Sequence, residues 1–207
     1  MELAERFYQE QGYKCIAGID EVGRGPWAGP VAAAAVVLPM GFPVHLMKDS
    51  KQLTAKMREE LYYLISEQAD WGVGLVSAAV IDEKGIIAAT QEAMNMAVAD
   101  LEHQPDFLLV DGAPQVDFVQ PNTAIVRGDA LVASIAAASI MAKVTRDRVM
   151  VALGRRYPQY GFERHKGYGT KEHQAALQKH GGCEIHRYTY RPIGKILASS
   201  NLASCAS

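Results

Sequence analysis

Two apolar runs joined by a short polar turn constrain the fold of this 207-residue chain most strongly. The first run, Cys15 to Ile19, ends at the adjacent acids Asp20 and Glu21, and the second run covers residues 31–38. The turn between the runs reads Gly23-Arg24-Gly25-Pro26. Because this connection is short, we expect two neighbouring antiparallel strands with two carboxylates at the end of the first one.

The remaining sequence alternates between strand and helix patterns. Strands are predicted over 13–19, 29–38, 71–80, 107–110 and 123–126, and helices over 54–69, 81–101, 131–153 and 171–180. Thr54 is suited to cap the first of these helices. Strands that come first and then alternate with helices predict an α/β domain with a mixed sheet. The small and polar tail, 198–207, is expected to be flexible.

Charge is distributed unevenly although the formal net charge is only −2. Residues 143–195 contain twelve Lys and Arg and four acids, a balance of +8, which leaves −10 for the rest of the chain. A basic segment beside an acidic remainder suits a protein that grips a polyanion and gathers acids elsewhere. The alternative is an uneven but solvated surface.

The bulk properties favour a cytoplasmic protein without a membrane span. The three cysteines show no metal-ligand spacing, so we expect no disulfide. The charged N-terminus lacks the apolar segment of a signal peptide. The longest wholly apolar run, 31–38, is far shorter than the ~20 residues that a membrane span needs. The histidines at 165, 173, 180 and 186 lack a zinc-binding pattern and are expected at the surface or as caps.

Four carboxylates follow predicted strands and are the candidate catalytic residues: Asp20, Glu21, Asp111 and Asp129. In open α/β sheets, sites gather where strand ends meet. Carboxylates that meet there would repel one another unless a divalent cation lies among them. Mg²⁺ or Mn²⁺ is expected, since Zn²⁺ usually brings His or Cys ligands. A single Asp at a strand end is more often a turn residue or a helix cap.

Four motifs in this chain resemble those of bacterial ribonuclease HII. They are Asp20-Glu21-Val22-Gly23-Arg24-Gly25-Pro26, Val126-Arg127-Gly128-Asp129, the run 136–147, and His165-Lys166-Gly167-Tyr168-Gly169-Thr170. The resemblance extends from about Cys15 to Pro192, with the motifs in the family's order and spacing. The related ribonuclease HIII carries an extra N-terminal domain. Only a short segment precedes Cys15 here, which favours the HII type.

The resemblance implies a ribonuclease H-like fold, a mixed five-stranded sheet flanked by helices with a C-terminal helical portion. We expect a single catalytic domain over 1–207, in which 143–195 form a basic helical portion that grips the substrate. The implied enzyme is an endoribonuclease that hydrolyses the RNA strand of RNA–DNA hybrids and incises 5′ of single ribonucleotides in duplex DNA. Two ions of Mg²⁺ or Mn²⁺ would act together and leave 5′-phosphate and 3′-hydroxyl ends.

The resemblance also implies roles for individual residues. Asp20, Glu21, Asp111 and Asp129 correspond to the metal ligands. Gly23, Arg24 and Gly25 correspond to the loop that reads the ribose 2′-hydroxyl, and Tyr168 to the tyrosine that packs on the sugar past the RNA–DNA junction. Further candidate contacts to the nucleic-acid backbone are Ser50, Lys51, Lys143, Arg146, Lys166 and Lys171. Each of these cations taken alone is more often a solvated surface charge.

Two other functions are compatible with parts of this pattern. One is a module that binds hybrids without cutting them, although the presence of all four carboxylates argues against it. The other is a metal-dependent nuclease that acts on plain DNA. The sequence leaves open the preferred metal and whether the tail recruits a replication clamp. A monomer is the simplest oligomeric state.

Overall fold

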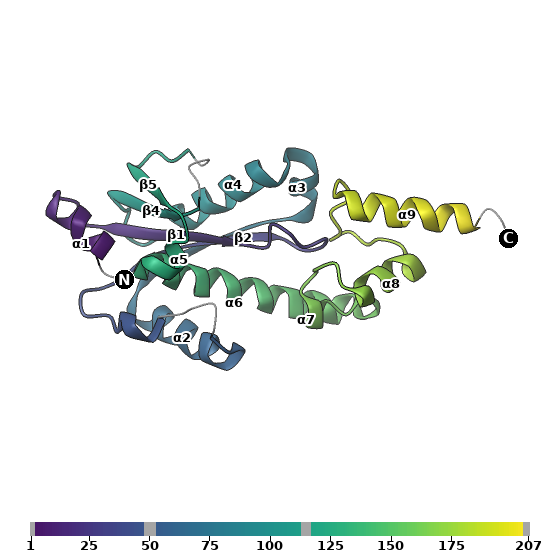
Figure 1. Ribbon diagram of the computed structural model, residues 1–207, viewed down its shortest axis with the longest axis horizontal. Coiled ribbons are helices and arrows are strands. Elements are labelled where there is room, and N and C mark those ends of the chain that lie inside the picture. Colours follow the sequence, from purple (N-terminus) through teal and green to yellow (C-terminus); the bar gives the residue numbers. More distant parts are fainter. Residues whose placement is uncertain (1–2, 48–52, 113–116, 205–207) are drawn as a thin grey trace. The chain divides into compact units, whose positions relative to one another are not determined.

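The chain forms two compact units in the computed structural model, which describes residues 3–47, 53–112 and 117–204 (Figure 1). The first unit consists of Met1–Val22, Ala32–Leu75 and Thr90–Val144. The second consists of Gly23–Val31, Val76–Ala89 and Thr145–Ser207. The last segment of the second unit therefore begins at Thr145, two residues after Lys143, where the basic portion was predicted to start. The prediction of one domain stays a prediction.

A mixed five-stranded sheet with the order β3-β2-β1-β4-β5 forms the framework, as predicted. The strands are β1 (Ile16–Val22), β2 (Val31–Val37), β3 (Asp70–Val76), β4 (Phe107–Asp111) and β5 (Asn122–Ile125). Strand β1 runs antiparallel to β2 and parallel to β4. Strand β4 is also parallel to β5. Because Ile19 pairs with Val110, the next residues, Asp20 and Asp111, lie at corresponding positions of neighbouring strands.

Helices fill most of the remaining chain. They are α1 (Leu3–Glu10), α2 (Ala55–Gln68), α3 (Ala78–Lys84), α4 (Ile86–Ala99), α5 (Gly128–Leu131), α6 (Ala133–Arg156), α7 (Phe162–His165), α8 (Lys171–His180) and α9 (Arg191–Ser204), with 3-10 turns η1 (Val44–Met47) and η3 (Pro158–Tyr160). Thr54 caps α2 as predicted, since its hydroxyl accepts a hydrogen bond from the Met57 N–H at 3.2 Å.

The observed elements differ from the predicted ones at several places. The third strand ends at Val76 instead of 80, and the helix predicted over 81–101 is split into α3 and α4 at Gly85, whose φ of 82° favours glycine. Helices α1, α5, α7 and α9 were not predicted. Residues 198–204 of the tail expected to be flexible continue α9, and 205–207 lie outside the described residues, so the flexibility of the tail stays a prediction.

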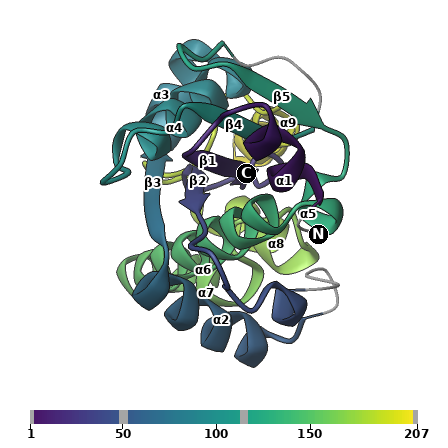
Figure 2. The same ribbon diagram turned by 90° about the vertical axis from the view of Figure 1, so that its left-hand side faces the viewer.

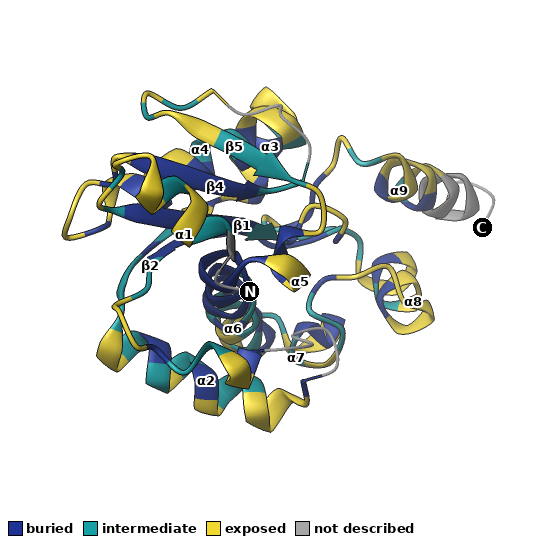
Figure 3. Ribbon diagram, turned by 60° about the vertical axis from the view of Figure 1, so that its left-hand side comes forward, coloured by how far each residue is buried: buried dark blue, intermediate teal, exposed yellow. Residues whose placement is uncertain are grey.

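The core of the first unit is built on very close packing between α6 and the sheet. Buried alanines of α6 pack with Ala34 and Val36 of β2 and with Leu61 and Ile65 of α2. Helices α6 and α2 lie on the same face of the sheet, with α6 nearer to the strands (Figure 2). Figure 3 shows the strands β1 and β2 and the inner side of α6 as buried. Small side chains along α6 allow this distance of approach.

Gly18 marks the closest point of this packing. A Cβ atom on Gly18 would lie 2.2 Å from the carbonyl carbon of Ser134 and 2.3 Å from the nitrogen of Ile135. The backbone of α6 therefore passes directly over β1, with no side chain between them.

The second unit has its own apolar core. It consists of Ala28, which precedes β2, Tyr160 of η3, and buried residues of α6, α7, α8 and α9, namely Met150, Phe162, Leu177, Ile193 and Ile196. The predicted basic segment thus encloses an apolar cluster, and its charges are distributed around that cluster.

We predict that Gly18→Ala destabilises the protein by about 3 kcal/mol or more, because backbone atoms of α6 would have to move. Gly194→Ala in α9 is the matched control, since no atom lies within 4 Å of the added Cβ. There the exchange should stabilise by about 0.5–1 kcal/mol. Urea unfolding measures both values, and a Gly18→Ala variant as stable as the wild type would contradict the packing described.

Candidate active site

Asp20 lies within β1, two residues before its end at Val22, although the acids were expected to follow the strand. It is held by hydrogen bonds and is only 7% exposed. Its Oδ1 accepts a hydrogen bond from the Glu21 N–H at 2.7 Å. Its carboxyl group also accepts a hydrogen bond from the Ser139 hydroxyl of α6. In a strand, Asp20 faces the same side as Gly18, and Ser139 follows Ile135 by one helical turn. The close approach at Gly18 therefore brings Ser139 to Asp20.

Asp111 and Asp129 meet beside β4. Asp111 ends the strand, and its Oδ1 accepts a hydrogen bond from the Asp129 backbone N–H at 3.3 Å. Asp129 is 5% exposed and lies in the first turn of α5. A Cβ on Gly128 would lie 2.6 Å from Cδ1 of Ile135, so the end of the Ile135 side chain would have to shift to admit a larger residue beside these two acids. The tight turn at 127–129 thus delivers Asp129 to the end of β4.

Negative charge is crowded around Asp20. Burial and, to a smaller extent, the charges of Glu21 and Asp111 raise its pKa, which lies at about 8. The hydrogen bonds from Ser139 and from the Glu21 N–H act in the opposite direction. The raised pKa means that a nearby positive charge would stabilise the ionised form of Asp20.

These acids suit a hard divalent cation, because carboxylate oxygens are the ligands that Mg²⁺ and Mn²⁺ prefer. Glu21 and Asp111 are close enough to Asp20 to perturb its pKa, and Asp111 contacts Asp129. Over the described ranges, no three His, Cys, Asp or Glu side chains are arranged as a ready-made metal cluster. The four-carboxylate ligand set therefore stays a prediction, with side-chain adjustment needed to close it around an ion.

The loop Gly23–Pro30 of the second unit is fixed by two buried arginines. Arg187 donates hydrogen bonds to the carbonyls of Gly23 at 2.6 Å, Arg24 at 3.0 Å and Gly29 at 2.9 Å. Arg146 donates to the carbonyls of Pro30 at 2.9 Å and Ala28 at 3.2 Å. Burial lowers the pKa of both guanidinium groups, that of Arg146 to about 10, so both stay charged at neutral pH.

The two glycines of this loop differ in their surroundings. A Cβ on Gly23, whose φ is 92°, would lie 2.2 Å from Nε of Arg146, so the fold itself requires glycine there. A Cβ on Gly25 would meet no atom within 4 Å, and its φ does not demand glycine. The packing of the chain therefore explains Gly23 and leaves Gly25 free for a close approach by a ligand.

The other predicted substrate contacts have mixed outcomes. The prediction that Arg146 contacts the nucleic-acid backbone is wrong. Its side chain is fully buried and bound to backbone carbonyls, so it cannot touch a phosphate directly. Lys166 is partly exposed, and its ammonium donates to the Glu163 carbonyl. Lys143 is partly exposed on α6, and Lys171 is exposed at the start of α8. Ser50 and Lys51 lie outside the described residues.

Tyr168 lies on the loop between α7 and α8 with 43% of its surface exposed. Two residues of this loop, Lys166 and Gly167, have left-handed backbones with φ of 52° and 85°. The Gly167 carbonyl accepts a hydrogen bond from the Trp27 N–H at 2.8 Å. This bond ties the Tyr168 loop to the Gly23–Pro30 loop within the second unit.

Sequence reasoning missed four residues that shape these groups: Ser139, His173, His186 and Arg187. His173 and His186 were expected at the surface or as caps, but they are 0% and 1% exposed. Ser139 belongs to one of the quoted motifs, yet only its place on α6 shows that it reaches Asp20. A buried His or Arg looks the same as a surface one in a sequence, so no local signal distinguishes them.

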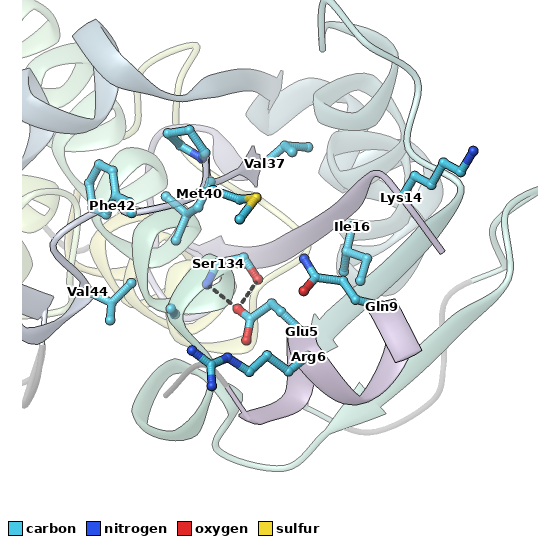
Figure 4. Close-up of a pocket in the computed structure, with 14 residues that line it drawn as sticks. Glu5, Arg6, Gln9, Lys14, Ile16, Val37, Met40, Phe42, Val44 and Ser134 are labelled. Carbon is cyan, nitrogen blue, oxygen red and sulfur yellow. Dashed lines mark hydrogen bonds between the residues drawn. The ribbon is translucent and has the colours of Figure 1, made fainter. Parts of the chain in front are cut away.

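A separate hollow of about 200 Å³ lies in the first unit among α1, β2 and the start of α6 (Figure 4). Its lining includes Glu5, Arg6, Met40 and Ser134. Oε1 of Glu5 accepts hydrogen bonds from the Ser134 N–H at 3.0 Å and the Ser134 hydroxyl at 2.9 Å (Figure 4). Glu5 thereby caps the N-terminus of α6, which is a structural role.

The raised pKa of Asp20 makes a prediction for the metal-free protein. The folded state keeps the Asp20 proton while the unfolded state releases it, so this group's contribution to stability falls as pH rises from about 4 to about 8. Asp20→Asn removes the titrating group, so the variant does not lose this stability as pH rises. In EDTA at pH 8 we expect the variant to be more stable by about 2–4 kcal/mol, with the difference vanishing near pH 4.

Thermal unfolding at both pH values tests this expectation, with exposed Glu60→Gln on α2 as the control. Added Mg²⁺ should raise the Tm of the wild type more than that of Asp20→Asn. A stability difference that does not change with pH would show that Asp20 is not perturbed as described.

No helix in the described ranges is both long enough and apolar enough to span a bilayer.

Residues 17–192 match the family model of Ribonuclease HII. The chain is 50% identical over 200 residues to a Ribonuclease HII of Endomicrobium trichonymphae, covering 96% of this chain and 95% of the relative.

Among solved structures, the ribonuclease H2 from Pyrococcus horikoshii OT3 matches with a TM-score of 0.77 and 29% identity, over 91% of this chain and 99% of that one. RNase HII from Archaeoglobus fulgidus, solved as a complex with PCNA, matches with a TM-score of 0.73 and 26% identity, over 86% and 96%. Together with the carboxylates at the ends of β1 and β4, these matches show that the chain belongs to the ribonuclease HII family, whose members are metal-dependent ribonucleases H.

Proposed function

We propose that this endoribonuclease, which acts on RNA in RNA–DNA hybrids, also incises 5′ of single ribonucleotides in duplex DNA with the aid of two divalent ions. The observation that carries the proposal is the meeting of acids at neighbouring strand ends. Asp20 and Asp111 lie at corresponding positions of β1 and β4, and Asp129 is bound to Asp111. Such a set supplies carboxylate oxygens from several directions, as two ions sharing a phosphodiester require.

The metal ions would supply an activated water and neutralise charge on the leaving oxygen. The chain's own residues prepare the site for them. The Ser139 hydroxyl and the Glu21 N–H orient the Asp20 carboxyl group, and the Asp129 N–H orients that of Asp111. These bonds restrict both carboxyl groups before substrate arrives, so the side-chain adjustment needed to close them around the ions is limited.

Choice of RNA would rest on the loop Gly23–Pro30. The carbonyls of Gly23 and Arg24 are held by Arg187. The open space at Gly25 allows a sugar to approach the backbone closely, and a 2′-hydroxyl can both donate and accept a hydrogen bond. The buried charges of Arg146 and Arg187 add a positive potential to this loop, which favours phosphate nearby without direct contact.

Tyr168 would read the sugar beyond the ribonucleotide. Its ring is partly exposed on a backbone fixed by hydrogen bonds, which suits packing against a flat or apolar ligand surface. The PCNA complex of the Archaeoglobus fulgidus relative supports a sliding clamp as a partner of this chain too. We further propose that the protein acts as a monomer.

Cleavage-site mapping on a duplex with one ribonucleotide tests the proposal. We expect a single cut on the 5′ side of that ribonucleotide in Mg²⁺ or Mn²⁺, leaving a 5′-phosphate. Asp20→Asn should bind the same duplex within about threefold of the wild type but lose at least 100-fold in kcat, because one metal ligand is gone.

The matched duplex with deoxyribonucleotides only should remain intact. Cleavage of that duplex would instead support a plain DNA nuclease. Binding of hybrid without any cut would support a module that lacks catalysis.

We predict that Tyr168→Ala lowers kcat/KM at a lone ribonucleotide about tenfold more than on a continuous RNA–DNA hybrid. The ring contributes about 1–3 kcal/mol of stacking, and only the lone ribonucleotide presents the junction sugar. Tyr168→Phe keeps the ring and should stay within threefold of the wild type on both substrates. Equal losses of Tyr168→Ala on the two substrates would refute the junction-reading role.

A further inference from the structure

Three histidines pack together beneath the Tyr168 loop in the second unit. His165 of α7 stacks on His173 of α8 with ring centroids 4.6 Å apart and planes at 13°. Nε2 of His173 lies 3.0 Å from Nε2 of His186. Trp27 and Phe162 enclose His173, with centroid distances of 5.6 Å and 5.4 Å. No part of this cluster belongs to the carboxylate group or to a metal-ligand pattern.

The hydrogen bonds of the pair determine which ring nitrogens carry protons. Nδ1 of His186 accepts the Cys183 backbone N–H at 2.8 Å, so His186 carries its proton on Nε2. That proton is donated to Nε2 of His173, which therefore carries its own proton on Nδ1. Nδ1 of His173 lies 3.0 Å from the Tyr168 carbonyl and donates to it. A directed chain of three hydrogen bonds thus runs from Cys183 to Tyr168.

This chain completes the binding of the loop backbone around Tyr168. The carbonyl of His165 accepts from the Tyr168 N–H at 2.9 Å, and that of Lys166 from Nη1 of Arg146 at 3.1 Å. The Gly167 carbonyl accepts from Trp27, and the Tyr168 carbonyl from His173. Each of these four successive carbonyls therefore has a donor. Such a network can hold the left-handed conformation of Lys166, which costs about 1 kcal/mol or more.

From this geometry we infer that His173 and His186 are positioning residues, which orient the Tyr168 loop through the directed chain for reading of the junction sugar. The inference rests on the proposed role of Tyr168 and adds the device that fixes its backbone. Tyr168 presents its ring on a backbone whose carbonyl is held from within the unit. Loss of the His173 donor would let the loop sample other conformations, although the Thr170 N–H still binds the same carbonyl at 2.8 Å.

The surroundings keep both imidazoles neutral. Burial and, to a smaller extent, charge on His165 lower the pKa of His173 and of His186 to about 4. The other titratable groups that face the pair are Cys183, whose Sγ is 3.2 Å from Nδ1 of His186, Tyr160 on the ring of His186, and Glu172, which is paired with Arg164. Protonation of His173 at Nε2 would break the His173–His186 bond, whereas protonation of His186 at Nδ1 would break the bond from the Cys183 N–H.

Nitrogen-15 spectra of the imidazole groups in the full-length protein test the chain directly. At pH 6 we expect His173 in the Nδ1–H form and His186 in the Nε2–H form, both neutral. Exposed His180 at the end of α8 lies outside the directed chain and serves as the internal control. The opposite tautomers, or a charged imidazole in the pair at pH 6, would overturn the inference whatever Tyr168 does.

Substitutions then test the link to Tyr168. His173→Leu removes the donor, whereas His173→Asn places an amide N–H where Nδ1 was. We expect His173→Leu to lower the ratio of kcat/KM at a lone ribonucleotide to that on a continuous hybrid by about fivefold, and His173→Asn to restore it to within twofold. His180→Asn should leave the ratio unchanged. Because the two histidines act in series, the double variant with His186→Leu should be no worse than His173→Leu alone.

These outcomes separate the two proposals. If Tyr168→Ala lowers the ratio while folded His173→Leu does not, the positioning role is wrong and the proposed function stands. If Tyr168→Ala leaves the ratio unchanged, the proposed role of Tyr168 is wrong and the positioning role falls with it. If His173→Leu fails to fold, then His173→Asn and the wild-type spectra decide, since loss of the ratio in folded His173→Asn contradicts the role of the donor.

Discussion

The direct contact between the backbone of α6 and strand β1 is the constraint on which the remaining geometry depends. Gly18 removes the side chain that would separate them, and the alanines of α6 keep the helix close along the sheet. The same helix then supplies Ser139 to Asp20 and, further along, Arg146 to the loop carbonyls. A helix with large residues on this face would hold Ser139 out of reach, since hydrogen bonds need about 3 Å.

The two units bury side chains of opposite charge. In the first, acids crowd at strand ends, and burial raises the pKa of Asp20 to about 8. In the second, Arg146 and Arg187 are buried as cations among backbone carbonyls. Carbonyl dipoles compensate a guanidinium without cancelling its charge, so that charge still acts on its surroundings. The acids of the first unit suit divalent cations and the buried arginines of the second suit a polyanion, and both are in agreement with a nucleic-acid substrate.

The sequence predicted the elements whose patterns are local. The apolar runs around Asp20 revealed β1 and β2, and the Thr54 cap fixed the start of α2. Prediction from the sequence failed where contacts between distant parts of the chain determine the position of a side chain. Arg146 looks like a surface cation on a basic helix, yet the carbonyls of the neighbouring loop draw it inside. His173 and His186 lie 13 residues apart, and nothing in their spacing shows that their rings meet. The end of α3 at Gly85 was not predicted, because apolar residues occur both before and after this glycine.

The contrast between Gly23 and Gly25 shows how structure refines a motif. Gly23 is needed because Arg146 occupies the space of a side chain, so its presence alone carries no information about substrate. Gly25 has open space and an ordinary backbone, so folding gives no reason for glycine at that position. The loop carbonyls at Gly23 and Arg24 are bound before any ligand arrives, so little conformational entropy remains to be lost on binding. A rigid loop with one uncovered backbone position is therefore better suited to distinguish a ribose from a deoxyribose than a flexible loop, because a flexible loop could adapt to either sugar.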